Sequence, residues 1–325
     1  MKLSRRQLCC SICMAALLPT PSRAQPFPNK PVRIILPFPA GTGPDGVMRL
    51  VGDKLGKLWG TPVVIDNRPG GNGWIGVEAA KRSPADGYTF LLVDASYVAI
   101  QPHLHKRLPF DPFHDFEPVA PMYRTNYFVV VSADSKWDSV ADLAAAAKEA
   151  KGQLTYGSSG VGSQLHVNAA TLATALGLPM THIPIKDTPQ VYTSIARGDI
   201  AWAFGTAATA GPLAKAGKIK LLALAALQRH PSYPDVPTVR EAGGPPSLEA
   251  RTWVALFAPT GVPAPIVERV NADVIRVMAE PDIRERLDAV GFAAWAGSPA
   301  HLRKVMDEDY LQFGQVIKSL KISLD

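Results

Sequence analysis

The chain has 325 residues, of which 47% are hydrophobic and 19% are charged. This composition is that of an ordinary globular protein and excludes disordered, collagen-like and coiled-coil proteins, and the length suggests two domains. The net charge of +6 comes mostly from residues 1–24, which hold four basic residues and no acid; without them, 30 basic residues stand against 28 acidic ones. With no dense basic stripe elsewhere, we expect no nucleic-acid partner.

Residues 1–24 have the pattern of a secretory signal peptide. Arg5 and Arg6 precede the apolar run Leu8–Leu18, and Ser22-Arg23-Ala24 is a small-x-small cleavage site. The run is too short for a stable membrane anchor. We therefore predict a periplasmic protein, exported by the general secretory (Sec) pathway or, because paired arginines also open twin-arginine signals, by that second route.

Metal and disulfide chemistry have little support in the mature chain. All three cysteines lie in the leader, at Cys9, Cys10 and Cys13. The cluster of His103, His105 and His114 suggests a metal site, but the prolines around it favour a surface loop, and the nearby acids show no metal-ligand spacing. We expect neither a metal nor a cofactor.

Strand and helix patterns alternate after the leader, which predicts an α/β fold with largely parallel sheets. The predicted strands are Val32–Leu36, Pro62–Asp66, Thr89–Val93, Tyr127–Val131, Leu154–Gly157, His182–Ile185, Ile200–Phe204, Leu221–Ala226 and Trp253–Phe257. The clearest predicted helices are 45–58, 73–82, 141–150, 265–279, 281–290 and 299–319.

The chain has no linker of low complexity between its two expected domains. We therefore expect the domains to be joined by chain crossings, with Tyr127–Val131 and Trp253–Phe257 as the crossing strands. The expected division is a discontinuous domain 1, residues 25–126 plus 254–325, and a domain 2, residues 127–253. A monomer is the default expectation.

Three glycine-rich turns each follow a strand and open a helix: Pro37–Gly46, Arg68–Gly76 and Gly157–Ser163. Helix N-termini expose free N–H groups, and glycine lets a ligand approach the backbone closely. Such turns can bind anions at the carboxyl ends of strands. Each turn could instead be a tight strand-to-helix connection with no ligand.

The first two turns also match the dinucleotide fingerprint, through Gly41-x-Gly43-x-x-Gly46 and Gly71-x-Gly73-x-x-Gly76. Four residues separate the first strand from Gly41, and Pro44 lies inside the motif. Both features disfavour dinucleotide binding.

Several segments together carry a family resemblance by their order and spacing. They are Pro31–Gly41 with Asp45, Val63–Gly70, Pro84–Thr89, Leu108–Pro112, Ser158–Ser163 with His166, and Pro234–Val239. Over essentially the whole mature chain, the sequence resembles the solute receptors of tripartite tricarboxylate transporters, the Bug family of periplasmic binding proteins.

The resemblance implies a two-domain periplasmic-binding-protein (Venus flytrap) fold, type II-like, that delivers a carboxylate-bearing small molecule to membrane permease subunits. In such receptors one carboxylate is held between the first turn and the domain-2 Ser/Gly turn, partly through water. By position, this implies Phe38, Ala40, Gly41 and Asp45 on one domain and Ser158, Ser159, Gly160, Gly162 and Ser163 on the other, with His166 in the same motif.

The sequence departs from the family pattern at two turns. Thr42 stands where a second glycine is usual, and Gly205-Thr206 replaces an aspartate after the strand Ile200–Phe204. The lost side chain implies a larger pocket or a missing polar contact, so we expect an atypical, bulkier ligand.

Further candidates come from the residues themselves. Ser96 and Tyr97 follow the third strand and are candidates for the wall of the ligand site in the first domain. Arg124 and Lys186 are the basic residues best placed to pair with a distal carboxylate, although a residue of this kind is more often a solvated or lining charge. Asp45 and Ser163 also suit plain helix caps.

Two other functions are alternatives to a transport receptor. A ligand sensor for a membrane signalling partner would need the same domain closure. A periplasmic hydrolase is disfavoured, because Ser158 and Ser159 lie in no nucleophile-elbow pattern and His166 has no evident third partner.

Overall fold

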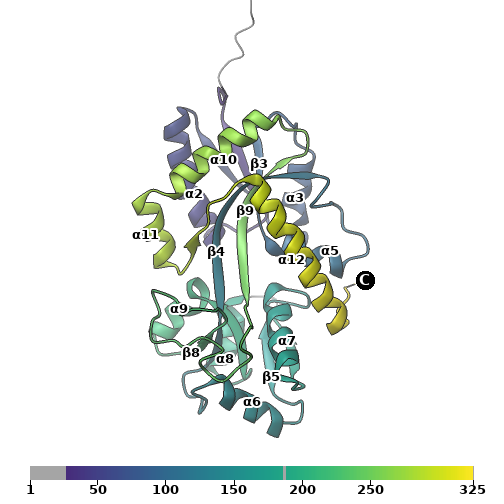
Figure 1. Cartoon of the computed structure of the whole chain (residues 1–325), viewed down its shortest axis with the longest axis vertical. Helices are drawn as coiled ribbons and strands as arrows, with labels where there is room; N and C mark the ends of the chain where they lie inside the picture. The colour runs from purple at the N-terminus through teal and green to yellow at the C-terminus, as the bar shows by residue number, and fades with distance from the viewer. Residues whose placement is uncertain (1–26, 186–187, 325) are drawn as a thin grey trace, which may run out of the picture.

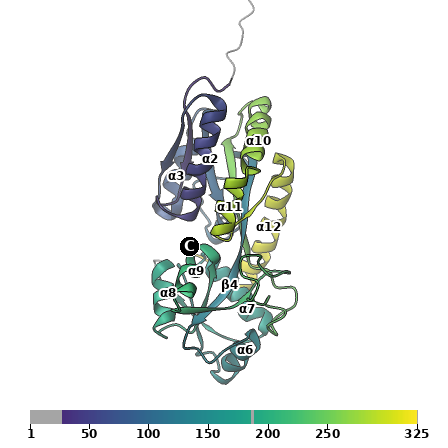
Figure 2. The same cartoon turned by 90° about the vertical axis from the view of Figure 1, so that its left-hand side faces the viewer.

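The computed structural model describes residues 27–185 and 188–324, so the predicted signal peptide lies outside the described residues. The described chain forms two α/β lobes along its longest axis (Figures 1 and 2). Two long strands, β4 (Phe116–Ser132) and β9 (Arg251–Pro259), run between the lobes. The predicted two-lobed fold with two crossing strands is confirmed.

The first lobe is built on the sheet order β2–β1–β3–β9–β4. The strands β2 (Val63–Asn67), β1 (Val32–Leu36) and β3 (Thr89–Asp94) are parallel, and β9 joins β3 in the antiparallel direction. The helices α2 (Gly43–Trp59), α10 (Ala264–Met278) and α11 (Pro281–Ala289) bury apolar side chains on one face. The other face is covered by α3 (Trp74–Lys81), α4 (Ala95–Ala99) and α12 (Pro299–Leu320).

The second lobe has the order β4–β7–β5–β6, with β8 on the other side of β4. Its strands are β5 (Thr155–Ser158), β6 (Thr181–Pro184), β7 (Trp202–Thr206) and β8 (Ile219–Leu224). One core lies beneath α6 (Val140–Glu149) and α7 (Gln164–Leu176), and a second beneath α8 (Thr188–Ala196) and α9 (Ala207–Lys215).

Strand β4 belongs to both lobes. It pairs with β9 as far as Asn126 and with β7 and β8 from Tyr127 onward. The sequence pattern predicted only its second half, because Pro118 and Pro121 argue against a strand. Both prolines lie where the β4–β9 register shifts, and such irregularities tolerate a residue without an N–H. We propose that the boundary between the domains follows this change of partner. The chain would then enter the second domain near residue 127 and re-enter the first domain near residue 253.

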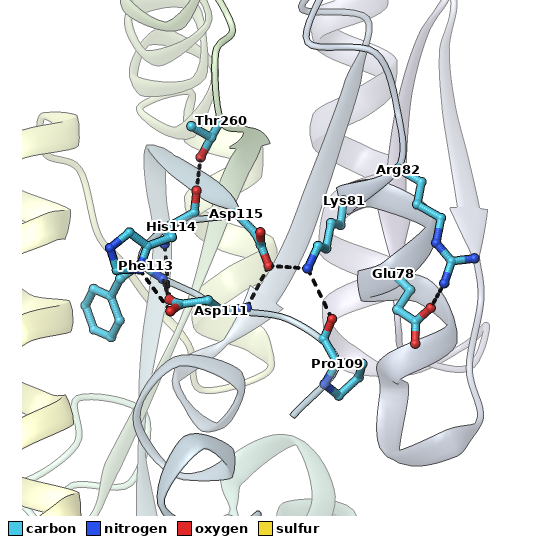
Figure 3. Close-up of polar contacts among 9 residues, drawn as sticks. All are labelled: Glu78, Lys81, Arg82, Pro109, Asp111, Phe113, His114, Asp115 and Thr260. Atoms are coloured by element: carbon cyan, nitrogen blue, oxygen red, sulfur yellow. Dashed lines mark hydrogen bonds and ion pairs between the residues drawn. The ribbon is translucent and has the colours of Figure 1, made fainter. Parts of the chain in front are cut away.

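The histidine-containing segment after β3 is more ordered than the predicted surface loop. It includes α4 and α5 (Gln101–Leu104), and His103 Nε2 lies 2.8 Å from the Tyr310 carbonyl oxygen. Further on, Asp111 accepts the N–H groups of Phe113 and His114, and Lys81 pairs with Asp115 at 2.8 Å (Figure 3). These contacts fix the conformation of the segment 111–115 and hold it against α3.

No group of three or more histidine, cysteine, aspartate or glutamate side chains is placed to hold a metal ion within residues 27–185 and 188–324. Over the same ranges, no helix combines the length and apolar character that a bilayer span requires.

Candidate functional site

A cavity of about 760 Å³ lies between the two lobes and takes its lining from both. Nine of the residues predicted from the sequence line it. They are Phe38, Thr42, Ser96 and Tyr97 from the first lobe and Ser159, Gly160, Gly162, Ser163 and Thr206 from the second. The structure thus brings together residues that lie as far apart as 168 positions in the sequence, between positions 38 and 206.

The first glycine-rich turn presents Thr42 to the cavity and keeps Asp45 behind it. Thr42 is the N-cap residue of α2, whereas Asp45 is only 3% exposed. The Asp45 carboxylate accepts the Gly41 N–H at 2.8 Å and the Asn67 Nδ2 at 2.9 Å, and it pairs with Arg49. Burial raises the pKa of Asp45, but the hydrogen bonds from Arg49, Gly41 and Asn67 outweigh burial and hold it below its usual value.

Asp45 therefore shapes the first turn from behind. Ala40 and Gly41, which were also expected at the ligand, do not line the cavity. Gly41 has a φ of +83°, which glycine adopts without strain, and its N–H is already taken by Asp45.

The second glycine-rich turn contributes little to the cavity wall. Of its residues only Asn72 appears in the lining. Gly73 matters indirectly, because a Cβ there would lie 1.9 Å from the Tyr97 hydroxyl oxygen. Its absent side chain lets Tyr97 reach its place beside the cavity.

The third turn lines the second-lobe side of the cavity. Ser163 caps α7 by accepting the His166 N–H at 3.2 Å. Gly162 has a φ of +74°, and a Cβ there would lie 2.4 Å from Leu104 Cδ1 in the first lobe. Glycine at position 162 therefore allows both the left-handed backbone of the turn and the close contact with Leu104 of the other lobe.

Ser158 and His166 lie beneath this turn, outside the lining. Ser158 is fully buried; its Oγ donates to the Gly160 carbonyl oxygen at 2.8 Å and lies 2.6 Å from His182 Nε2. His166 Nδ1 accepts the Gly162 N–H at 2.9 Å. Burial lowers the pKa of His166 and of His182 to about 4, and for His166 the neighbouring His182 adds to the effect. Both rings are neutral at pH 7 and support the turn.

Gly205 was expected either to enlarge the pocket or to leave a polar contact missing, and the structure argues against the first alternative. A Cβ at Gly205 would lie 2.8 Å from Ala210 Cβ and 3.0 Å from the Tyr192 hydroxyl oxygen. The glycine makes room for the Tyr192 ring, which itself lines the cavity and lies within hydrogen-bond distance of Thr209. Thr206 beside it does line the cavity, and it caps α9.

Of the two predicted basic partners, only Arg124 lies within the described residues, and it does not line the cavity. The Arg124 guanidinium lies 3.8 Å from the centre of the Trp295 ring, and the residue is absent from the lining. Lys186 lies outside the described residues. No lysine or arginine lines the cavity within the part of the chain that the structure describes.

Asp94 and most of the aromatic side chains in the wall were not predicted from the sequence. Asp94 ends β3 and accepts the Ser96 N–H at 2.9 Å and also the Ser96 hydroxyl. The aromatic residues are Phe38, Tyr97, Tyr123, Tyr127, Tyr192 and Phe292, of which Phe38 and Tyr97 were predicted. The one available signal was the position of Asp94 at the carboxyl end of a parallel strand, the edge where ligands bind in open α/β sheets.

Comparisons with known proteins agree with this architecture. A model of the tripartite tricarboxylate transporter family receptor matches residues 47–322. A protein from the tcbD-tcbE intergenic region of Pseudomonas sp. strain P51 is 30% identical, over 99% of this chain and 96% of its own length. Protein BugT of Bordetella pertussis is 27% identical, over 92% of this chain and 91% of its own length.

Solved structures give the same result. The protein Rpa4515 of R. palustris, solved with adipate, has a TM-score of 0.83 and 29% identity, covering 92% of this chain and all of the other. MatC of Rhodopseudomonas palustris, solved with malate, has a TM-score of 0.78 and 28% identity over 90% of this chain and all of the other. The two-lobed binding-protein fold, the matched family model and the full-length relatives together show that this chain belongs to the tripartite tricarboxylate transporter receptor family, which includes the Bug proteins.

Proposed function

We propose that this protein is a periplasmic receptor that captures a carboxylate-bearing small molecule between its lobes and delivers it, as a monomer, to a tripartite tricarboxylate-type permease. The observation that carries the proposal is the shared cavity, to which both lobes contribute a turn rich in glycine and hydroxyl groups. Hydroxyl and backbone donors can satisfy a carboxylate without a full counter-charge. Such binding leaves the ligand easy to release once the lobes separate.

The cavity's size and lining suit an organic acid. Its volume of about 760 Å³ falls within the usual range for small-molecule sites, and aromatic side chains form much of its wall. The structures solved with adipate and malate support dicarboxylates as a starting class, and the aromatic wall favours aromatic acids as well. Tricarboxylates complete the panel to be tested.

The environment of Ser158 supports receptor over hydrolase. A nucleophilic hydroxyl must reach the substrate, whereas this one is fully buried and is engaged with Gly160 and His182. The environment of Ser158 does not distinguish a transport receptor from a ligand sensor, because a sensor would use the same cavity. Uptake of labelled ligand by vesicles that carry the permease separates the two roles.

Calorimetric titration of residues 25–325 against dicarboxylates, tricarboxylates, aromatic acids and sugars tests ligand capture. We expect saturable binding of at least one carboxylate and none of the sugars. Ser159→Ala should weaken that binding about tenfold or more, the value of one lost hydrogen bond to a charged group. Ser247→Ala, at an exposed position outside the cavity, is the matched control. Binding of sugars alone would overturn the proposal.

A further inference from the structure

We propose that Leu324, which follows the helix α12, contacts the ligand and limits its size. The inference deepens the proposed function and rests on it, since it assumes that a carboxylate-bearing molecule occupies the cavity between the lobes. It gives a specificity-determining role to residues 321–324, a segment in which the sequence shows no binding motif.

Leu324 belongs to the cavity wall although it comes after the last helix in the chain. The chain that follows α12 lies between the two lobes in both views (Figures 1 and 2). Leu324 is 39% exposed, and Val161, a lining residue of the second lobe, is 43% exposed. A ligand that covers these two side chains removes apolar surface from water, which favours binding.

The path from α12 to the cavity is set by the way the helix ends. Lys321 has a φ of +53°, and its N–H donates to the Lys318 carbonyl oxygen at 3.2 Å. The Ile322 N–H donates to the Ile317 carbonyl oxygen at 3.3 Å, and both isoleucines pack in one apolar cluster. These are the bonds and the apolar contact of a Schellman motif, which reverses the chain at a helix end. The reversal leads residues 322–324 back from the helix end to the cavity.

Leu104 holds the segment in place at the wall. The Leu324 N–H donates to the Leu104 carbonyl oxygen at 3.1 Å, and both residues line the cavity. Leu104 in turn lies so close to Gly162 of the second lobe that its Cδ1 leaves no room for a Cβ there. Leu324 therefore lies where the first lobe meets the Ser/Gly turn of the second, and a change in its size changes the space left for a ligand.

A purely structural role for Leu324 leads to a different expectation. If the side chain only packed against its neighbours, truncation would lower stability and weaken every ligand by the same factor. A size limit instead acts differently on small and large ligands. The ratio of two affinities, measured on one variant, isolates this difference because a uniform loss cancels in the ratio.

The experiment compares small and large acids on variants of one position. Residues 25–325 are titrated calorimetrically with dicarboxylates of four to ten carbons and with benzoate and 2-naphthoate. We expect Leu324→Ala to shift the affinity ratio about tenfold or more toward the larger acids and Leu324→Trp to shift it toward the smaller ones. A few carbon atoms in an apolar pocket give about this discrimination. Leu311→Ala makes the same truncation on α12 outside the lining and should leave the ratio unchanged.

Two variants of Lys321 test the path of the segment without altering a side chain of the wall. Glycine adopts the backbone conformation of Lys321 without strain, so Lys321→Gly should keep the wild-type ratio. Proline holds φ near −65° and lacks the N–H that bonds to Lys318, so Lys321→Pro should redirect the segment. We expect Lys321→Pro to shift the ratio in the same direction as Leu324→Ala.

The outcomes separate the inference from the function on which it rests. Carboxylates that bind with the same ratio in the wild type and in both Leu324 variants overturn the inference and leave the receptor function intact. A uniform loss of affinity in Leu324→Ala has the same meaning, because Leu324 then only supports the wall. An unchanged ratio in Lys321→Pro overturns the role given to the chain reversal. The absence of binding by every carboxylate overturns the proposed function, and the inference with it.

Discussion

The imidazole rings of His166 and His182 stack with their centroids 3.7 Å apart and their planes 8° from parallel, beneath the Ser/Gly turn of the cavity. One ring comes from α7 and the other from β6, and each holds a different part of the turn, Gly162 and Ser158 respectively. Two stacked rings in a half-buried site tolerate a proton on either ring poorly. The second-lobe wall of the cavity therefore depends on both rings being neutral.

Acid should destabilise the protein as the pH falls from about 6.5 to 4. The pKa of each ring is about 4 in the folded protein, below the ordinary value of 6.5, so the unfolded chain binds more protons in that window and acid favours unfolding. The slope is at most about 1.4 kcal/mol per pH unit for each ring, less what solvent screens. Melting temperature measured against pH checks this; His182→Gln should flatten the curve, and an unchanged slope would assign the acid sensitivity to other groups.

Gly162→Ala should weaken ligand binding and lower stability. The new Cβ would lie 2.4 Å from Leu104 Cδ1 and the residue would keep a φ of +74°, so strain and a clash between lobes act together. We expect a loss of about 1–3 kcal/mol. Gly177→Ala, at the C-cap of α7, has a φ of +67° but no atom within 4 Å of the added Cβ, so it measures the backbone strain alone. Equal losses in the two variants would show that the contact with Leu104 is unimportant.

Asp45→Asn should loosen the first turn without removing a group from the cavity wall. The neutral amide loses the ion pair with Arg49 and weakens the bond from the Gly41 N–H, for a cost of about 1.5–3 kcal/mol. Chemical denaturation measures this, and ligand affinity should fall because Thr42 is displaced. The exposed Asp53 on the same helix supplies the control, Asp53→Asn. A variant as stable as the control would contradict the role given to Asp45.

Leu104→Ala tests the apolar contact between the lobes. Leu104 of α5 is buried with Ile100, with Val167 of α7 and with Ile317 of α12, the helix that extends from the first lobe toward the second (Figure 1). Truncation should cost about 2–5 kcal/mol of unfolding free energy if the cluster is packed throughout. The 65% exposed Leu311 on α12 provides the comparison through Leu311→Ala. A cost near that of the control would mean that the lobes are not held together by this cluster.

The strands and long helices were predictable because each has a local signature. Val32–Leu36 is a β-branched run, and α10 begins after Pro263, beside prolines suited to a first turn. The first half of β4 was not predictable from the sequence. It pairs with residues of β9 that lie more than 100 positions away, and it forms although it contains Pro118 and Pro121. The short helix α4 was also missed, since five residues carry too little periodicity to be recognised.

The amino-acid sequence by itself determined the alternation of strands and helices, the glycine-rich turns at the strand ends and the family, because these reside in local patterns and in their order. The tertiary structure decided which of the turn residues face the cavity. Asp45, Ser158 and His166 turn away to hold the backbone, whereas Asp94 at the end of β3 and Tyr123 within β4 reach the cavity wall only after folding. Burial depends on neighbours distant in sequence, so the character of the cavity wall, in which Asp94 lies among aromatic rings, follows from the packing of the two lobes.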